Sequence, residues 1–154
     1  AEQGVPVALF GATEEALARS SRELEARIPG LTIVARIAPS ERFDPAGAEA
    51  DAAIERLHRS GARLTFLALG APKQEVFAAR AKAMLPGMGF ASVGAGLDFI
   101  AGSQTRAPRS IRRIAMEWLW RMLSQPRRLA KRYLDCAILL PRLAAGVLSS
   151  RAAL

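Results

Sequence analysis

Residues 64–75 read Leu-Thr-Phe-Leu-Ala-Leu-Gly-Ala-Pro-Lys-Gln-Glu, which is an apolar run followed by a glycine turn and a polar segment. The run does not alternate between polar and apolar residues, which is typical of a strand buried on both faces in a parallel sheet. Gly70 suits a tight turn, and Pro72 suits the first position of a helix. The stretch therefore predicts a strand, a turn and a helix in close succession.

Three further apolar runs have the same character, and segments with helical periodicity separate them. The four predicted strands are residues 5–10, 31–34, 64–69 and 90–93. The three predicted helices are residues 13–27, with Thr13 as the N-cap, 46–60 and 72–84, and residues 39–45 are predicted to form a loop. This alternation predicts an α/β fold, a Rossmann-like parallel sheet with helices on both faces and right-handed crossovers.

The pattern changes after Gly102, where strands stop and three helices are predicted at residues 110–124, 127–140 and 141–148. Residues 103–154 contain 11 of the 22 basic residues and only two of the 14 acidic ones. We therefore expect two domains: an α/β core over residues 1–102 and a basic helical appendage over residues 103–154. The appendage must meet an anionic partner or stay solvated.

Composition excludes several classes of protein and of site. Of the 154 residues, 51% are hydrophobic and 23% charged, so the chain can form a globular core and is not disordered throughout. The single cysteine, Cys136, cannot form an internal disulfide. The only histidine, His58, has no second ligand at a suggestive spacing, so no metal site is predicted.

Residues that directly follow the strands are the first candidates for ligand binding, because open α/β sheets bind ligands at the carboxyl ends of their strands. The candidates are Gly11, Gln74, Gly94 and Asp98. The first turn of the helix that holds Gln74 could receive a nucleotide phosphate on free backbone N–H groups. The alternatives are that the glycines only make tight turns, that Gln74 and Glu75 are solvated, and that Asp98 only favours its own helix. The turns match neither a dinucleotide fingerprint nor a Walker loop.

Basic residues cluster in the appendage. Arg128, Lys131 and Arg132 share one predicted helix face, and Arg121 precedes them. Guanidinium groups bind phosphate oxygens in pairs, so this cluster suits a diphosphate. The alternative is a solvated basic face.

Taken together, these residues resemble the WecG/TagA/CpsF family of bacterial glycosyltransferases. The matching motifs are residues 70–75, 93–102, 106–108 and 117–121, with Pro126, Arg128, Arg132 and Tyr133. The resemblance implies an inverting, metal-independent enzyme that needs no cofactor. It moves an N-acetylmannosamine-type or related sugar from a UDP donor to a lipid-diphosphate-linked saccharide, in the synthesis of teichoic acid, common antigen or exopolysaccharide.

The resemblance also implies roles for single residues. Gln74, Gly94 and Asp98, with Gly11 by its position, correspond to the UDP-sugar pocket. Residues of the basic segment correspond to the arginines that close over the site and bind diphosphate: Arg106, Arg121, Arg128, Lys131 and Arg132.

The sequence departs from the family pattern in two ways, and these departures limit which family properties the resemblance implies for this chain. Family members usually carry a further N-terminal half that holds the proposed general base, and this sequence begins close to the strand that ends at Gly11. We therefore expect little transferase activity from this chain alone, and neither Glu75 nor Asp98 is assigned as the base. Leu97 stands where the family often has an aromatic residue, which leaves the identity of the sugar open.

The implied location is the cytoplasmic face of the cell membrane, with the enzyme bound peripherally. Residues 137–148 are too short to span a bilayer and suit an interfacial helix on anionic lipid. The alternative is that they pack against the missing half or a sister subunit, so a homo-oligomer is possible. A non-catalytic UDP-sugar-binding module and a nucleic-acid-binding module are the rival functions. The latter is disfavoured because few aromatic residues interleave with the basic ones.

Overall fold

A computed structural model of the chain describes residues 3–103, 108, 116, 119, 120 and 123. The chain divides into two compact units, Ala1–Thr105 and Arg106–Leu154. The sheet and the helices defined below all belong to the first unit.

A four-stranded parallel sheet forms the centre of this unit. Its strands are β1 (Val7–Gly11), β2 (Ile33–Ile37), β3 (Leu64–Ala68) and β4 (Gly89–Ser92), in the order β2-β1-β3-β4. All three pairings are parallel. The prediction of a Rossmann-like parallel sheet from the four apolar runs is confirmed.

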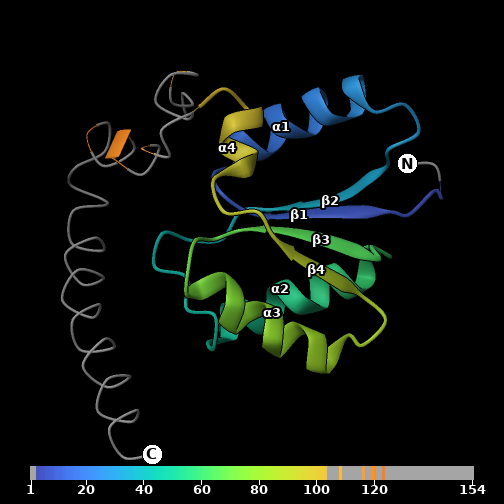
Figure 1. Ribbon diagram of the computed structural model, residues 1–154. Helices are drawn as coiled ribbons and strands as arrows, with labels where there is room; N and C mark the ends of the chain where they lie inside the picture. Colours follow the sequence, from blue (N-terminus) through green and yellow to red (C-terminus); the bar gives the residue numbers. More distant parts are fainter. Residues whose placement is uncertain (1–2, 104–107, 109–115, 117–118, 121–122, 124–154) are drawn as a thin grey trace, which may run out of the picture. The chain divides into compact units, whose positions relative to one another are not determined.

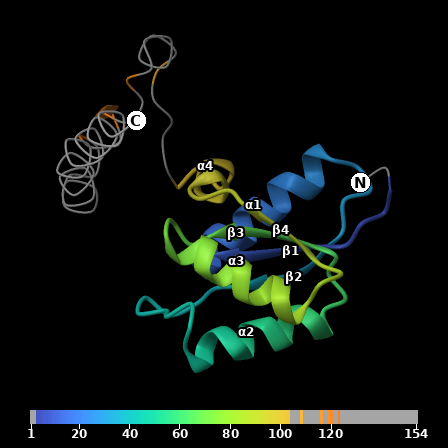
Figure 2. The same cartoon turned by 60° about the horizontal axis from the view of Figure 1, so that its bottom comes forward.

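Helices cover both faces of the sheet, as predicted. They are α1 (Glu14–Arg27), α2 (Ala48–Arg59), α3 (Lys73–Met84) and the short α4 (Gly96–Ile100). In Figure 1, α1 and α4 lie above the sheet and α2 and α3 lie below it, and the turned view in Figure 2 keeps the two pairs on separate faces. Each face buries its own apolar cluster, one around Leu9, Leu17 and Leu97 and the other around Phe10, Leu57 and Phe77.

Local sequence accounts for where α1 begins. The Thr13 hydroxyl accepts a hydrogen bond from the Ala16 N–H at 3.2 Å, which satisfies one of the free N–H groups at the start of the helix. Glu14 and Glu15 occupy the first turn, where negative charge interacts favourably with the helix dipole. The predicted N-cap is therefore confirmed.

Some predicted boundaries are wrong by one to three residues. β2 covers Ile33–Ile37 and not residues 31–34, and an irregularity in its register lies opposite Val7 and Ala8. Pro72 is the N-cap residue of α3 and not its first helical residue, with φ −88° and ψ 3°, and the peptide bond before it is cis.

The expectation that every strand is buried along its whole length is also wrong. β1 is buried throughout, whereas Val34 and Arg36 of β2 are exposed. β1 has a strand on either side, but β2 and β4 are the edges of the sheet.

Few residues of the second unit are described. The N–H groups of Leu119 and Trp120 both donate to the Met116 carbonyl oxygen at 3.1 Å, a helical turn within the helix predicted at residues 110–124. Within the part of the chain that the structure describes, every helix is too short or too polar to cross a membrane.

Candidate functional site

The order of the strands identifies the position on the sheet where a doubly wound fold is expected to bind a ligand. The chain passes from β1 outward to β2, then returns across β1 to β3 and continues to β4. The direction of winding therefore reverses between β1 and β3. In doubly wound α/β folds, ligands bind at this reversal, beside the carboxyl ends of the strands.

The turns after β1 and β3 meet at this reversal. Gly11 pairs with Ala68 at the ends of the two strands, and the Ala12 N–H donates to the Ala68 carbonyl oxygen at 3.1 Å. Gly11 has φ +106°, and a Cβ there would lie 2.6 Å from Ala68 backbone atoms. The close approach of the two strands therefore requires glycine at this position without any ligand, and a binding role for Gly11 stays a prediction.

Gln74 lies in the first turn of α3, directly after the turn at Gly70. The residue is only 9% exposed, and its backbone N–H donates to the Gly70 carbonyl oxygen at 3.1 Å. Its side-chain Nε2 donates to Glu75 Oε1 at 2.8 Å, whereas its Oε1 is buried and has no hydrogen-bond partner among the described residues. The alternative that Gln74 is solvated is therefore wrong, while Glu75 is exposed.

A buried polar atom of this kind is unusual, because most buried side-chain polar atoms in proteins are hydrogen-bonded. The buried atom is the side-chain Oε1 of Gln74, and Gln74 lies in the first turn of α3, the helix that follows β3 at the reversal of winding. Among the predicted site residues, its environment points most directly to a missing polar partner.

The loop between β2 and α2 is attached to α3 at the same end of the sheet. Lys73 Nζ donates to the Phe43 carbonyl oxygen at 2.7 Å. The Phe43 ring is buried, 5.5 Å from the Phe10 ring and 5.9 Å from the Phe77 ring. Sequence reasoning missed Lys73 and Phe43, although an aromatic residue inside the predicted loop at 39–45 was a signal that the loop is anchored.

Arg80 makes a second attachment between α3 and this region. Its guanidinium forms an ion pair with Asp51 of α2 at 2.6 Å, and its Nη1 donates to the carbonyl oxygens of Pro45 and Gly47 at 3.5 and 3.4 Å. Residues 38–47 are therefore held by side chains from two turns of α3.

Hydrogen bonds between Ser40 and Glu49 join the start of the same loop to the first turn of α2. Glu49 accepts hydrogen bonds from the Ser40 hydroxyl at 2.6 Å and from the Ser40 N–H at 2.7 Å. Both hydrogen bonds favour the ionised form of Glu49 and lower the pKa of its carboxyl below the usual 4.5. The bond from the Ser40 hydroxyl has the larger effect, and the bond from the Ser40 N–H has the smaller one.

Gly94 and Asp98 follow β4, one strand beyond β3. The N–H groups of Val93 and Gly94 donate to the Leu67 carbonyl oxygen at 2.9 and 3.2 Å, which fixes this turn against β3. Asp98 lies in α4, where its Oδ1 and its carbonyl oxygen accept from the Ser103 hydroxyl at 3.4 and 3.0 Å. Gln74 and Asp98 thus belong to helices on opposite faces of the sheet, α3 and α4. A ligand role for Gly94 and Asp98 stays a prediction.

The remaining predicted residues lie outside the part of the chain that the structure describes. They are Arg106, Arg121, Arg128, Lys131 and Arg132. Their predicted role in binding diphosphate therefore rests on the sequence alone.

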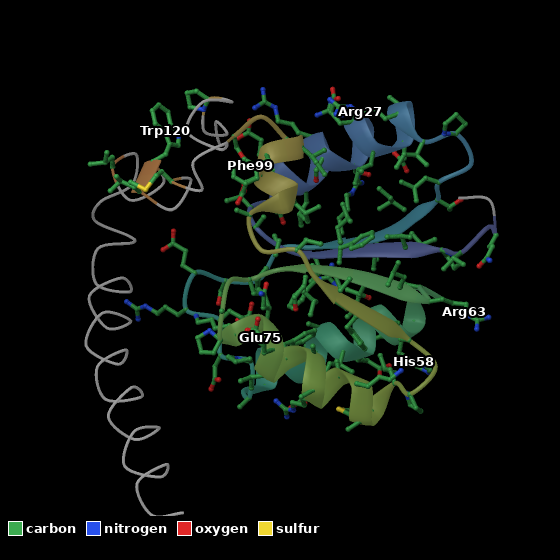
Figure 3. All side chains as sticks on the ribbon, in the orientation of Figure 1. Arg27, His58, Arg63, Glu75, Phe99 and Trp120 are labelled. Carbon is green, nitrogen blue, oxygen red and sulfur yellow. The ribbon has the colours of Figure 1, made fainter. Side chains whose placement is uncertain are left out.

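Some of the side chains labelled in Figure 3 lie at different ends of the sheet. Glu75 lies near the end where the strands finish, whereas His58 and Arg63 lie at the opposite end. Two hollows of about 310 and 590 Å³ lie along β2 and beside residues 3–6, and neither contains a predicted site residue. Within the described ranges, no three His, Cys, Asp or Glu side chains gather as a metal site would require.

One comparison with known proteins gives the chain a family. A family model described as "Glycosyl transferase WecG/TagA/CpsF family" matches residues 1–153, nearly the whole chain. The match includes both the sheet with its candidate site and the basic segment that follows. This chain therefore belongs to the WecG/TagA/CpsF family of glycosyltransferases.

Proposed function

We propose that this chain takes part in transferring a sugar from a UDP donor to a lipid-diphosphate-linked saccharide during synthesis of a cell-surface polysaccharide. Membership of a glycosyltransferase family supports transfer of a sugar. The observation that carries the donor site is the buried side-chain Oε1 of Gln74, in the first turn of α3, which has no hydrogen-bond partner among the described residues. The proposal includes inversion of configuration at the sugar carbon that is transferred, and a reaction that needs no metal.

The donor pocket in this proposal lies along the carboxyl edge from β1 to β4. Gly11 and Gln74 flank the reversal of the sheet, and Gly94 and Asp98 extend the pocket past β4. The position agrees with the general rule for ligands of doubly wound sheets. No residue of this chain is assigned as the general base.

The basic segment would supply the charge that a diphosphate requires. UDP as leaving group and the lipid diphosphate are both anionic, and fixed cations stabilise charge that develops on a departing group. Arg106, Arg121, Arg128, Lys131 and Arg132 are the proposed contacts. The same excess of positive charge favours peripheral binding to an anionic membrane surface.

Calorimetric titration of the chain with UDP tests the proposal, with GDP and NAD as competing nucleotides. We expect selective binding of UDP that both Gln74→Ala and Asp98→Ala weaken. Glu55→Gln serves as a matched control, because Glu55 pairs with Arg59 on the exposed surface of α2 at 3.1 Å. Equal binding of all three nucleotides, or UDP binding that neither site variant alters, would contradict the proposed donor pocket.

A further inference from the structure

The Gln74 side-chain amide is held in one orientation by its neighbour. An ionised carboxylate can only accept hydrogen bonds, so the amide must turn its NH2 group toward Glu75. The 2.8 Å contact between Gln74 Nε2 and Glu75 Oε1 agrees with this orientation. The reverse orientation would place two acceptors against each other.

This orientation leaves the acceptor of the Gln74 amide for a ligand. The acceptor of the amide is Oε1, which is buried and has no hydrogen-bond partner among the described residues, while Nε2 carries a second N–H besides the one that it donates to Glu75. An amide oxygen accepts hydrogen bonds and cannot donate them. Its partner must therefore carry an O–H or N–H group, which the oxygens of an ionised diphosphate lack.

The backbone N–H of Gln74 also has a partner. The Gln74 N–H already donates to the Gly70 carbonyl oxygen, and the Val76 N–H donates to the Pro72 carbonyl oxygen, both at 3.1 Å. The first of these bonds occupies one of the N–H groups that are free at a helix N-terminus, whereas the second is the first regular i→i−4 bond of α3. The Gln74 N–H is therefore not available to a ligand.

We propose that Gln74 Oε1 accepts a hydrogen bond from a hydroxyl or N–H group of the donor nucleotide, and that Glu75 is a positioning residue that keeps this oxygen turned toward the ligand. The proposal rests on the proposed function and deepens it. It assigns Gln74 Oε1 to a donating group of the ribose, the base or the transferred sugar, because the ionised diphosphate has no such group.

Calorimetric titrations with a set of matched ligands test this assignment on the whole chain. The probes are UDP, UDP-N-acetylglucosamine, N3-methyl-UDP, 2′-deoxy-UDP and 3′-deoxy-UDP. The variants are Gln74→Met, which keeps the volume and removes the acceptor, Glu75→Ala, and Glu55→Gln as the control that removes a carboxylate elsewhere. Glu75 is exposed, so Glu75→Ala should fold even where a change at buried Gln74 does not.

We expect Gln74→Met to weaken binding roughly tenfold for ligands that carry the donating group, and Glu75→Ala to weaken it by a smaller factor. The one analogue that lacks this group should bind the wild type and Gln74→Met equally. If the transferred sugar supplies the group, only UDP-N-acetylglucosamine should distinguish them. Spectra of the ¹⁵N-labelled side-chain amide should show the Gln74 NH2 resonances shifting in Glu75→Ala but not in Glu55→Gln.

The outcomes separate this inference from the proposed function. If UDP binds, no ligand distinguishes Gln74→Met from the wild type, and Asp98→Ala still weakens UDP binding, the inference fails and the donor pocket stands. If GDP binds in place of UDP with the same dependence on Gln74, the proposed donor fails and the inference about the acceptor holds. Unchanged Gln74 resonances in Glu75→Ala overturn the positioning role, and binding of no ligand in the set overturns both proposals.

Discussion

At the scale of single residues, the end of β1 depends on having no side chain at Gly11. A Cβ there would lie 2.6 Å from Ala68 backbone atoms, and the φ of +106° is unfavourable for any other residue. Backbone atoms cannot move aside as a flexible side chain can. The pairing of β1 with β3, and hence the reversal of the sheet, constrains this position tightly.

We therefore predict that Gly11→Ala lowers the free energy of unfolding by about 3 kcal/mol or more, because backbone strain and a backbone clash act together. Urea unfolding followed by circular dichroism measures the change. Gly61→Ala is the matched control, since Gly61 also has a positive φ, +70°, but has nothing within 4 Å of a Cβ. Its loss should be about 1 kcal/mol, the strain alone. Equal losses in the two variants would contradict the close-approach argument.

The Ser40–Glu49 contact makes a second prediction at this scale, one that depends on pH. The folded-state pKa of Glu49 lies below the ordinary value of 4.5. The contact therefore stabilises the folded chain above the unfolded pKa, and this contribution is lost as pH falls through the folded pKa. Carbon-13 NMR of the glutamate carboxyl groups should show Glu49 titrating at lower pH than in Ser40→Ala. A titration that Ser40→Ala leaves unchanged would be evidence against this hydrogen bond.

At the scale of elements, α3 does more than cover one face of the sheet. Its first residue, Lys73, and its third turn, through Arg80, hold the loop between β2 and α2. The buried Phe43 ring anchors the same loop from inside. The arrangement ties the loop beside the candidate site to the helix that carries Gln74.

We predict that Lys73→Met speeds backbone hydrogen exchange over residues 38–47 and lowers overall stability by less than about 1 kcal/mol, because the lost hydrogen bond is partly exposed. Hydrogen exchange followed by mass spectrometry measures the change. Lys82→Met is the matched control at the other end of α3, where Lys82 Nζ donates to the carbonyl oxygens of Pro86 and Met88 at 2.7 and 3.0 Å. Its effect should be confined to residues 85–89. Unchanged exchange over residues 38–47 in Lys73→Met would rule out the attachment.

The edge strand β2 has two features that disfavour pairing with another strand. The register of its pairing with β1 shifts between Val7 and Ala8, and Arg36 places a charge on the exposed part of the strand. Both are means by which proteins protect sheet edges from association.

At the scale of the whole molecule, charge is distributed unevenly along the chain. Residues 103–154 carry 11 basic and two acidic side chains, whereas residues 1–102 carry 11 and 12. Clustered positive charge attracts anionic surfaces, and salt weakens the attraction.

We predict that the chain floats with vesicles containing anionic lipid and not with neutral vesicles, and that raising the salt concentration reduces binding. Replacing Arg128, Lys131 and Arg132 together by Gln should reduce binding at low salt, because each charge near the surface contributes about 1 kcal/mol. A triple replacement of Arg22, Arg27 and Arg59 by Gln, which lie on α1 and α2, is the control with the same loss of net charge. Equal losses in the two triple variants would show that only net charge matters.

The sequence by itself determined the class of fold, the positions of the main elements and the family. Apolar runs without alternation and a capped helix after a glycine turn are local signals, and local signals are enough to identify a parallel α/β sheet. They also placed Gln74 at the start of a helix. They could not settle whether Gln74 was buried or solvated, since that depends on packing by residues distant in the sequence.

Only the tertiary structure decided the environment of the site. The order β2-β1-β3-β4 placed the reversal between β1 and β3, and so brought the turns at Gly11 and Gly70 to neighbouring strand ends. Packing buried Gln74 Oε1, and the ring of Phe43 became part of the core through contacts with Phe10 and Phe77. These features depend on contacts between distant segments, whereas helix caps and strand patterns depend on neighbours along the chain.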